Sequence, residues 1–409
     1  MRWLLFVVLL LLAGAGALSV ALTEGEPLVT RGETISPGAV AQARRLFLFN
    51  DPRRMRPGEQ RRVALPATLV DEGINYLASR ALRGRGALAL GEDTAELRLT
   101  RRLPLPVVDR YLNLRVVVGE ATGEPRIAAA ALGKLAIPAS LAEFALAAAI
   151  RAAGYEREWS LARGAVRRLT FEPARQVLVV DFVWAPELLA RARSLAVAPA
   201  DLPRFRQAQT TLAALLDRHR PDARLALTSV LAPMLAVTDG QPPEQRRVAL
   251  LVLAFHLAGK NLANIVPDAA RWPRARPVTL MLANREDSAQ HFVISAALAA
   301  WAGEPVADAI GLYKELDDAR FGSGFSFADL AADRAGTRFG ELLARQPERI
   351  DALLQQAPGD ADLLPSLAGL PEYLPQREFQ RRFGGAGSPA FQKIADEIDR
   401  RVAALPLYR

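Results

Sequence analysis

The chain of 409 residues contains no cysteine. This absence excludes disulfide bonds, thiolate metal sites, a cysteine nucleophile and an acylated lipoprotein cysteine. Histidine is scarce as well, with three copies in the sequence. His219 lies in a charged loop and His256 in an apolar stretch, and neither has acidic or histidine neighbours at the spacing of metal ligands. We interpret His219 as solvated and His256 as a core residue, which leaves His291 as the histidine of interest.

Several classes of function lack their sequence motifs. The zinc-protease motif H-E-x-x-H, the nucleophile motif G-x-S-x-G, the P-loop and the dinucleotide-binding fingerprint are all missing. The net charge of +8 comes from arginines spread along the chain, not from a basic cluster with interleaved aromatic residues. We therefore exclude nucleic acid as a partner. A basic surface of this kind fits anionic lipid headgroups, and a membrane is the partner that we predict.

One apolar run, Trp3 to Leu22, is long enough to cross a bilayer as a helix of about 20 residues. We predict that residues 1–24 form a transmembrane anchor. The protein would then lie in the inner membrane through this single N-terminal span, with its bulk in the periplasm. The alternative is a cleaved signal peptide, because Ala15-Gly16-Ala17 is similar to an A-x-A cleavage site.

Residues 28–190 mix helical and strand patterns. Pro37 to Leu48 follows a capping Ser36, Thr68 is placed to cap a second helix, and Ile137 to Ala153 has helical spacing. Period-two alternation indicates antiparallel strands at 95–100, 114–118 and Val177 to Trp184. We predict an α+β domain with helices packed on a curved sheet. This order of elements resembles envelope domains that hold lipid tails against a bent sheet, and the alternative is a packed scaffold.

Residues 200–409 are mostly helical. Apolar residues recur every three or four positions, and Pro or Gly separates the segments. The predicted helices are Leu202 to Arg218, Leu225 to Val237, Pro243 to Ile265, Ala289 to Ala302, Pro305 to Leu316, Ala328 to Ala344 and Ser388 to Ala404. The predicted fold class is therefore α+β: an N-terminal membrane anchor, an antiparallel sheet with packed helices, and a mostly helical C-terminal domain. The sequence carries no signal of the oligomeric state.

Within this helical half, residues 287–340 concentrate acidic side chains around one histidine. Asp287, His291 and Ser295 are spaced four apart, so they project from one face of a helix. On the next helix, Glu315 and Asp318 share a face. Burying acids beside a histidine is costly unless they pair, become protonated or hold a ligand.

A third helix of this segment begins after Ser326, which is placed to cap it together with Asp329. Asp333 lies one turn beyond Asp329, and Gly336 and Gly340 continue along the same face. Glycine at this spacing allows a second helix to approach closely. We expect the three helices to pack together. His291 of the first helix, Glu315 of the second and Asp333 of the third would then meet at a common centre.

The order D-x-x-x-H-F, E-x-x-[QD] and F-S-x-x-D-x-x-A-[ND]-x-x-G-x-x-x-G resembles the VanZ-like membrane proteins and the YfiM-type periplasmic lipoproteins. The resemblance implies a polar cluster in an envelope protein without a settled chemistry. This chain departs from the first group because it lacks several membrane spans, and from the second because it lacks the lipoprotein cysteine. The whole chain is also similar to uncharacterised envelope proteins of Gram-negative bacteria. The matching positions are Asp287, His291, Phe292, Glu315, Asp318, Ser326, Asp329, Asp333, Gly336 and Gly340.

Three interpretations of the cluster follow. In the first, the cluster is a structural ion-pair network. In the second, His291, Glu315 and Asp333 act in acid/base or metal-assisted hydrolysis of a lipid or cell-wall substrate. In the third, the cluster is part of a binding module for a lipid or cell-wall precursor. The predicted function is a structural or binding role in upkeep of the cell envelope, and hydrolysis is the alternative. No cofactor is expected other than a divalent metal. The loop Arg320 to Ser326 is a candidate anion site, with Arg320, Ser326 and Asp318 as binding residues.

Overall fold

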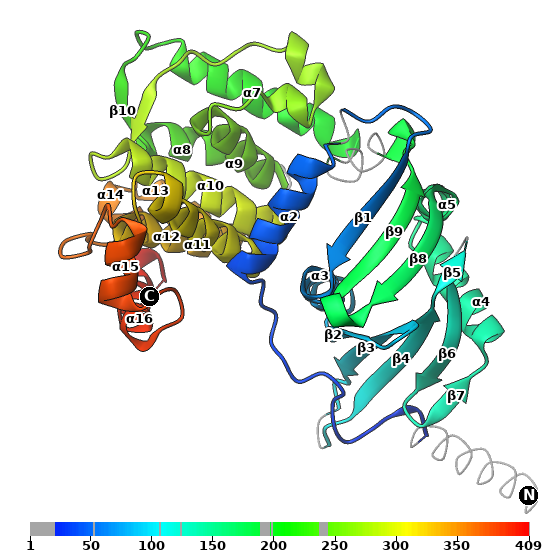
Figure 1. Ribbon diagram of the computed structural model, residues 1–409. Coiled ribbons are helices and arrows are strands. Elements are labelled where there is room, and N and C mark those ends of the chain that lie inside the picture. Colours follow the sequence, from blue (N-terminus) through cyan, green and yellow to red (C-terminus); the bar gives the residue numbers. More distant parts are fainter. Residues whose placement is uncertain are drawn as a thin grey trace, which may run out of the picture. The chain divides into compact units, whose positions relative to one another are not determined.

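The computed structural model describes residues 21–51, 54–105, 108–122, 125–188, 197, 199–236 and 244–408. The fold is α+β, with antiparallel sheets in the N-terminal half and many helices (Figure 1). The chain divides into two compact units, Met1–Ala192 and Arg193–Arg409.

The first unit contains two antiparallel sheets where the sequence predicted one. The four-stranded sheet has the order β1-β9-β8-β5, and the five-stranded sheet has the order β2-β3-β4-β6-β7. The chain passes from one sheet to the other through the single residue Glu120, since β4 ends at Gly119 and β5 begins at Ala121. A β-bulge between Val117 and Val118 precedes this crossing. The strands are β1 (Gln60–Pro66), β2 (Arg85–Leu90), β3 (Thr94–Arg102), β4 (Tyr111–Gly119), β5 (Ala121–Thr122), β6 (Arg126–Leu132), β7 (Leu135–Ile137), β8 (Val166–Glu172) and β9 (Val177–Val183).

Four described helices accompany these sheets. They are α2 (Pro37–Phe49), α3 (Ala67–Leu82), α4 (Ala139–Ala152) and α5 (Glu156–Ala165). The predicted cap of α2 is confirmed, because the Ser36 hydroxyl accepts a hydrogen bond from the Ala39 amide at 3.1 Å. The predicted Thr68 cap of α3 is wrong. Strand β1 runs directly into this helix, so Pro66 occupies the cap position and Thr68 already lies in the first turn.

The second unit is a helical assembly with one small parallel strand pair. Strand β10 (Arg224–Ala226) pairs with β11 (Thr279–Met281), and the chain begins α8 only after β10. The prediction of one helix over Leu225 to Val237 is therefore wrong at its start. The helices are α7 (Leu202–Leu216), α8 (Thr228–Leu235), α9 (Glu244–Leu257), α10 (Glu286–Ala302), α11 (Glu304–Phe321), α12 (Phe327–Arg345), α13 (Pro347–Gln355), α14 (Asp360–Leu363), α15 (Gln376–Phe383) and α16 (Pro389–Ala403).

Helix α9 ends at Leu257, eight residues before the predicted end at Ile265. The Lys260 amide bonds the Phe255 carbonyl, and Gly259 has a φ of +60°. This left-handed geometry closes the last turn of the helix, and glycine adopts it without steric cost.

Helices α10 and α12 form the closest helix pair of this unit. A Cβ atom at Gly336 would overlap the carbonyl oxygen of Phe292, and one at Gly340 would overlap that of Ala296. The prediction that these glycines admit a neighbouring helix is confirmed. The two helix backbones therefore touch directly, and every side chain on the facing surfaces is fixed in position by that contact.

The prediction of an inner-membrane protein with a single N-terminal span is contradicted. In the described ranges, no helix is both long enough and apolar enough to cross a membrane. The apolar helix α10 is instead a core element of the helical unit, with ten buried residues. Residues 1–20, which hold most of the predicted anchor, lie outside the described part of the chain.

We expect Gly336→Ala to destabilise the helical unit by about 1–3 kcal/mol, because an added methyl group forces α10 and α12 apart. Urea unfolding followed by circular dichroism measures the loss. Gly73→Ala in α3 is the matched control, since a Cβ there meets nothing within 4 Å. That change should be neutral or stabilise α3 by about 0.5–1 kcal/mol, the usual difference between the two residues in a helix. Equal losses in both variants would contradict the packing argument.

Candidate functional site

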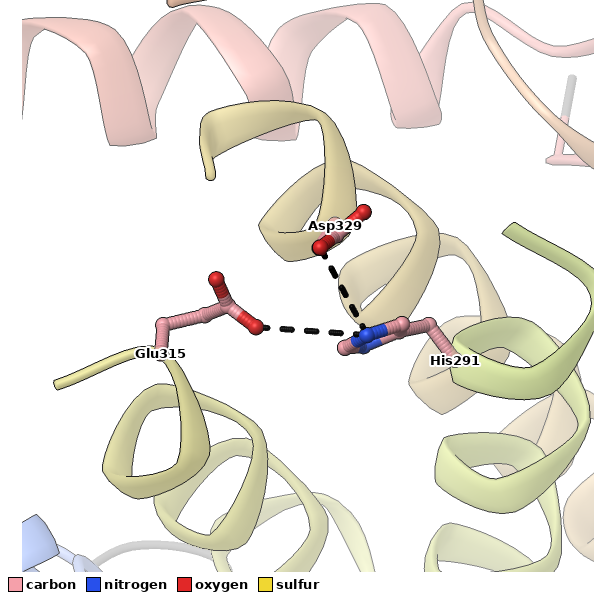
Figure 2. A group of neighbouring side chains, drawn as sticks. All are labelled: His291, Glu315 and Asp329. Atoms are coloured by element: carbon pink, nitrogen blue, oxygen red, sulfur yellow. Dashed lines mark ion pairs between the residues drawn. The ribbon is translucent and has the colours of Figure 1, made fainter. Parts of the chain in front are cut away.

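Helices α10, α11 and α12 place three acidic side chains around His291. Figure 2 shows two of them, Glu315 and Asp329. The Nε2 atom of His291 lies 3.7 Å from Asp329 Oδ2 and 4.0 Å from Glu315 Oε1. On the other side of the ring, Nδ1 lies 3.0 Å from Asp333 Oδ1. All four residues are buried, and Glu315 is completely inaccessible to solvent. The structure thus brings the three predicted residues together and adds Asp329 to them.

Small residues make room for Asp333 between the helices. A Cβ at Gly311 of α11 would lie 2.8 Å from Asp333 Oδ2, so only glycine fits beside that carboxylate without displacing it. Ser295, one turn beyond His291 on α10, donates a hydrogen bond of 2.7 Å to Asp333 Oδ1. Asp333 is therefore held by two groups from α10, and it fixes the orientation of the imidazole.

Three carboxylate oxygens of the cluster are buried without a hydrogen-bond partner among the described residues. They are Glu315 Oε1, Asp329 Oδ1 and Asp333 Oδ2. The second oxygen of Glu315 is satisfied, because it accepts a hydrogen bond of 3.0 Å from the Ser326 amide. Buried polar atoms are almost always paired in proteins, and each unpaired one costs about 1–3 kcal/mol. The free oxygen of Glu315 faces His291 Nε2, which is where a bound cation would satisfy it.

Lys314 supplies a positive charge at the edge of this cluster. Its Nζ lies 3.1 Å from His291 Nε2 and 3.6 Å from Glu315 Oε1, and it donates to Asp318 Oδ2 at 2.9 Å. The positive charge of Lys314 at this distance opposes the protonated form of His291 and so acts to lower the pKa of the imidazole. The lysine side chain is 51% exposed, so it can leave His291 and remain on Asp318.

Burial and mutual repulsion shift the protonation of the cluster. Burial and the charge of Asp333 raise the pKa of Glu315 to about 8. Burial opposes the charged form of His291, but the charge and hydrogen bond of Asp333 outweigh it and raise the pKa of His291 to about 9. Burial also raises the pKa of Asp329. The cluster therefore carries more negative charge than its surroundings can accommodate, and it retains protons at neutral pH in the absence of another cation.

A second ion network supports the outer side of the site. Arg285, just before α10, forms ion pairs with Asp287 and Glu372 and lies 3.9 Å from Asp329 Oδ1. Asp287 shares a helix face with His291, as its spacing indicated, but its carboxylate binds Arg285 and the Ser288 amide. Arg285 thus orients Asp329 from outside while His291 contacts it from within.

Of the predicted binding residues, Asp318 and Arg320 lie at the end of α11, and Ser326 lies in the connection to α12. Ser326 caps α12, since its hydroxyl accepts from the Asp329 amide at 3.1 Å. Asp318 holds Lys314, and its carbonyl accepts from the amides of Gly322 and Gly324. The amides of Gly322, Gly324 and Ser326 are thus bonded within the protein, and Arg320 is exposed. Anion binding by Arg320, Ser326 and Asp318 stays a prediction.

Sequence reasoning missed two members of the site. Asp329 was explained as a capping residue, and Lys314 was passed over beside Glu315. The signal for Lys314 was its spacing of four from Asp318, which places both on the face that reaches His291. The signal for Asp329 was its position one turn before Asp333, since residues four apart on a helix point the same way.

The arrangement is suited to a divalent cation. One ligand atom each from His291, Glu315 and Asp329 lie within 4.8 Å of one another. Ligands of a tetrahedral ion with bonds of about 2.1 Å are about 3.4 Å apart, so the two carboxylate oxygens would have to approach His291 Nε2 by about 0.3–0.6 Å and each other by up to about 1.4 Å to complete the site. No family model, no curated protein and no solved structure matches this chain. The resemblance to VanZ-like and YfiM-type proteins therefore stays a prediction.

We expect chelator-treated protein to lose stability as the pH rises from about 5 to about 9. The pKa of Glu315 is raised from 4.5 to about 8 on folding, so the folded state binds the extra proton in that interval. The pKa of His291 is raised from 6.5 to about 9, so its stabilising contribution is complete below pH 6.5 and disappears through pH 9. The free energy of unfolding should fall by a few kcal/mol.

Urea unfolding at a series of pH values tests this dependence. Glu315→Gln removes the buried charge and keeps the bond from the Ser326 amide, so this variant should show a flatter profile. It should also be more stable than the unsubstituted protein at pH 8.5. A profile that rises with pH, or a Glu315→Gln variant that is weaker at high pH, would contradict the assigned charge state.

Proposed function

We propose that the protein is a metal-dependent hydrolase whose divalent cation is held by His291, Glu315 and Asp329. The observation that carries this proposal is the convergence of three ligand atoms within 4.8 Å, two of them on carboxylates with an unpaired buried oxygen. Cation binding would neutralise the negative charge that the helices have buried together. It would also give the unpaired Oε1 of Glu315 a partner, whereas the unpaired oxygen of Asp329 is Oδ1, on the side of Arg285.

Each residue has a distinct role in this proposal. His291 Nε2, Glu315 Oε1 and an oxygen of Asp329 are the ligands. Asp333 accepts the Nδ1 proton of His291, which keeps Nε2 free to bind metal, as carboxylates do for most metal-bound histidines. A site of one imidazole and two carboxylates suits Zn²⁺, Fe²⁺ or Mn²⁺. It suits less well an ion that prefers thiolate ligands or an ion that binds oxygen ligands alone.

Three protein ligands favour a catalytic centre over a structural one. Structural zinc sites have four protein ligands, whereas catalytic sites have three and keep a position for water or substrate. A bound cation lowers the pKa of that water and supplies the nucleophile for hydrolysis. Arg285, which contacts Asp329, lines a surface hollow of about 610 Å³ together with Asp287 and Tyr373. Substrate would approach from this side, and the envelope resemblance favours a lipid or cell-wall substrate.

A structural or binding role in the cell envelope is the second proposal. The observation that favours it is the set of direct bonds that join the three helices, namely His291 and Ser295 to Asp333, and Ser326 to Glu315. In this view, Lys314 is the permanent cation of the network. Acid/base hydrolysis through the His291 and Asp333 pair without metal is a variant of the first proposal.

We expect chelator-treated protein to bind one Zn²⁺ or Mn²⁺ ion, as measured by isothermal titration calorimetry and elemental analysis. His291→Ala, Glu315→Gln and Asp329→Asn should each weaken binding by about 10- to 100-fold or more, and Asp333→Asn by about 10- to 100-fold through the orientation of His291. Asp308→Asn is the matched control, because Asp308 is a partly buried acid that pairs with Arg334 outside the cluster. Unchanged affinity in the three ligand variants would contradict the metal site.

Lys314→Met should raise the metal affinity by about tenfold, because the ammonium no longer competes for Nε2 and Glu315. Lys314→Arg retains the charge and should bind metal about as the unsubstituted protein does. Competition with a fluorescent chelator measures both. If Lys314 is instead the permanent cation of a structural network, Lys314→Met should lower the melting temperature and leave metal binding undetectable.

Hydrolysis itself is tested with 4-nitrophenyl esters and phosphodiesters under metal saturation. The rate should disappear on chelation and return when metal is added. Glu315→Gln and Asp329→Asn should be inactive while folded by circular dichroism. Metal binding without turnover of either substrate class would favour the structural proposal over hydrolysis.

A further inference from the structure

A cavity of about 290 Å³ lies at the C-terminal end of α9 in the second unit. Its walls come from α7, α9, the two short 3₁₀ helices η4 (Leu262–Asn264) and η5 (Pro267–Arg271), and the segments that join them. None of the lining residues belongs to α10, α11 or α12, so the cavity is separate from the cluster around His291. A cavity of about 150 Å³ is enough to hold one benzene molecule, so this one accommodates a small organic molecule.

His256 lines this cavity from the last turn of α9. The sequence predicted a core residue here, whereas the structure shows a half-buried side chain. Its imidazole has no hydrogen-bond or ion-pair partner among the described residues. Burial lowers the pKa of His256 from 6.5, so the ring is neutral near pH 7 and keeps one donor and one acceptor. The imidazole therefore has hydrogen-bonding capacity that the protein itself does not use.

Two cationic side chains line the same cavity. Lys260 follows the end of α9, Arg274 comes from the segment after η5, and neither has an ion-pair partner in the part of the chain that the structure describes. No acidic residue of the described ranges lines the cavity. Asp268, the acid closest to it in sequence, lines a separate hollow with Arg206 and Arg271. The positive charge in the cavity is therefore uncompensated.

The free polar groups around the cavity are mainly donors. The Phe255 carbonyl in the last turn of α9 accepts from the Lys260 amide, so this acceptor is already used. Asn261 Oδ1 accepts from the Ala263 amide at 2.9 Å, which leaves the amide group of Asn261 to donate. The negative end of a helix dipole amounts to about half an elementary charge. The two full charges of Lys260 and Arg274 exceed it, so the cavity favours an anion.

The segment that carries Arg274 is fixed on both sides. Gln209 Nε2 of α7 donates to the Pro273 carbonyl at 2.9 Å. Arg276 Nη1 donates to the His219 carbonyl at 3.0 Å. The backbone that presents Arg274 is thus anchored before any ligand binds, which lowers the entropic cost of binding.

One wall of the cavity is apolar. It comprises Val252 and Phe255 of α9, Leu262 of η4 and Ala269 of η5. Val252 and Leu262 are almost completely buried, with 1% and 6% of their surface exposed. An inorganic anion would leave this wall in contact with water, whereas a ligand with an apolar body would cover it. The cavity therefore matches a molecule that has both an apolar part and an acidic group.

We propose that this cavity binds a small amphiphilic anion, a molecule with an apolar body and one carboxylate or phosphate group. The acidic group pairs with Lys260 and Arg274 and accepts hydrogen bonds from Asn261 and His256. The apolar body covers the wall formed by α9, η4 and η5. Carboxylate and phosphate share this chemistry, because a guanidinium binds either one through two parallel hydrogen bonds. The site is independent of the proposed metal centre, since no residue of the cluster takes part.

The three histidines of the chain make a site-specific test practical. Their imidazole signals are followed by NMR in the chelator-treated full chain while sodium octanoate is added, and His256→Gln assigns the signal of His256. That signal should shift and saturate, while those of His219 and His291 stay unchanged. Octanol has the same chain without the charge, and acetate has the charge without the chain. Both should bind at least about tenfold more weakly than octanoate.

Variants test the role of the two cations. Lys260→Gln and Arg274→Gln should each weaken octanoate binding by about tenfold or more, because each removes a charge-assisted hydrogen bond. Arg271→Gln is the matched control, since it removes the same charge from the neighbouring hollow and should keep the affinity. Octyl phosphate in place of octanoate identifies the acidic group, because the anion that binds more tightly carries the preferred one.

Three results would overturn the proposal. The first is a His256 signal that responds to neither octanoate nor octyl phosphate. The second is octanol or acetate that binds as tightly as octanoate, which would show that one half of the ligand plays no part. The third is an equal loss of affinity in Arg271→Gln and Arg274→Gln, which would show that only the net charge of the surface matters.

Discussion

The direct contact between helices α10 and α12 is the constraint on which the candidate site depends. Gly336 and Gly340 let the two backbones touch, and Gly311 leaves space for a carboxylate beside them. His291 and Asp333 meet at 3.0 Å because of this approach. With larger residues at these glycines the helices would separate, and a buried charge pair would become two buried charges without partners. The close packing of these helices therefore determines the charge interactions within the cluster.

Charge compensation decides what the cluster does. Three carboxylates face one imidazole. Of the nearby cations in the described structure, Lys314 is half-exposed and shared with Asp318, and Arg285, 3.9 Å from Asp329, is shared with Asp287 and Glu372. A buried network meant only for stability would be expected to satisfy its oxygens, yet Glu315, Asp329 and Asp333 each keep one without a hydrogen-bond partner in the described residues. The pKa of Glu315 is raised for the same reason, because burial and the neighbouring carboxylates favour its protonated form. A divalent ion would correct both at once.

The sequence allowed the helical elements of the site to be predicted, but not all of its members. Helical spacing placed His291, Glu315 and Asp333 on the correct faces, and Ser326 was correctly expected to cap α12. Asp329 had a sufficient local explanation as a cap residue, and Lys314 was passed over. Their second roles arise only when three helices converge, which local periodicity does not encode. The pairing of β10 with β11 was invisible for the same reason, since more than fifty residues separate the two strands.

The two units differ in how they use apolar residues, and this difference bears on function. The buried cluster of the helical unit extends across nearly all its helices, whereas that of the first unit comprises Ala67, Ala95, Phe171 and Leu178. Most large apolar side chains that remain exposed belong to the first unit. The first unit therefore keeps apolar surface in contact with solvent after folding, α4 included, whereas the helical unit buries its apolar residues and gathers charge in the cluster around His291.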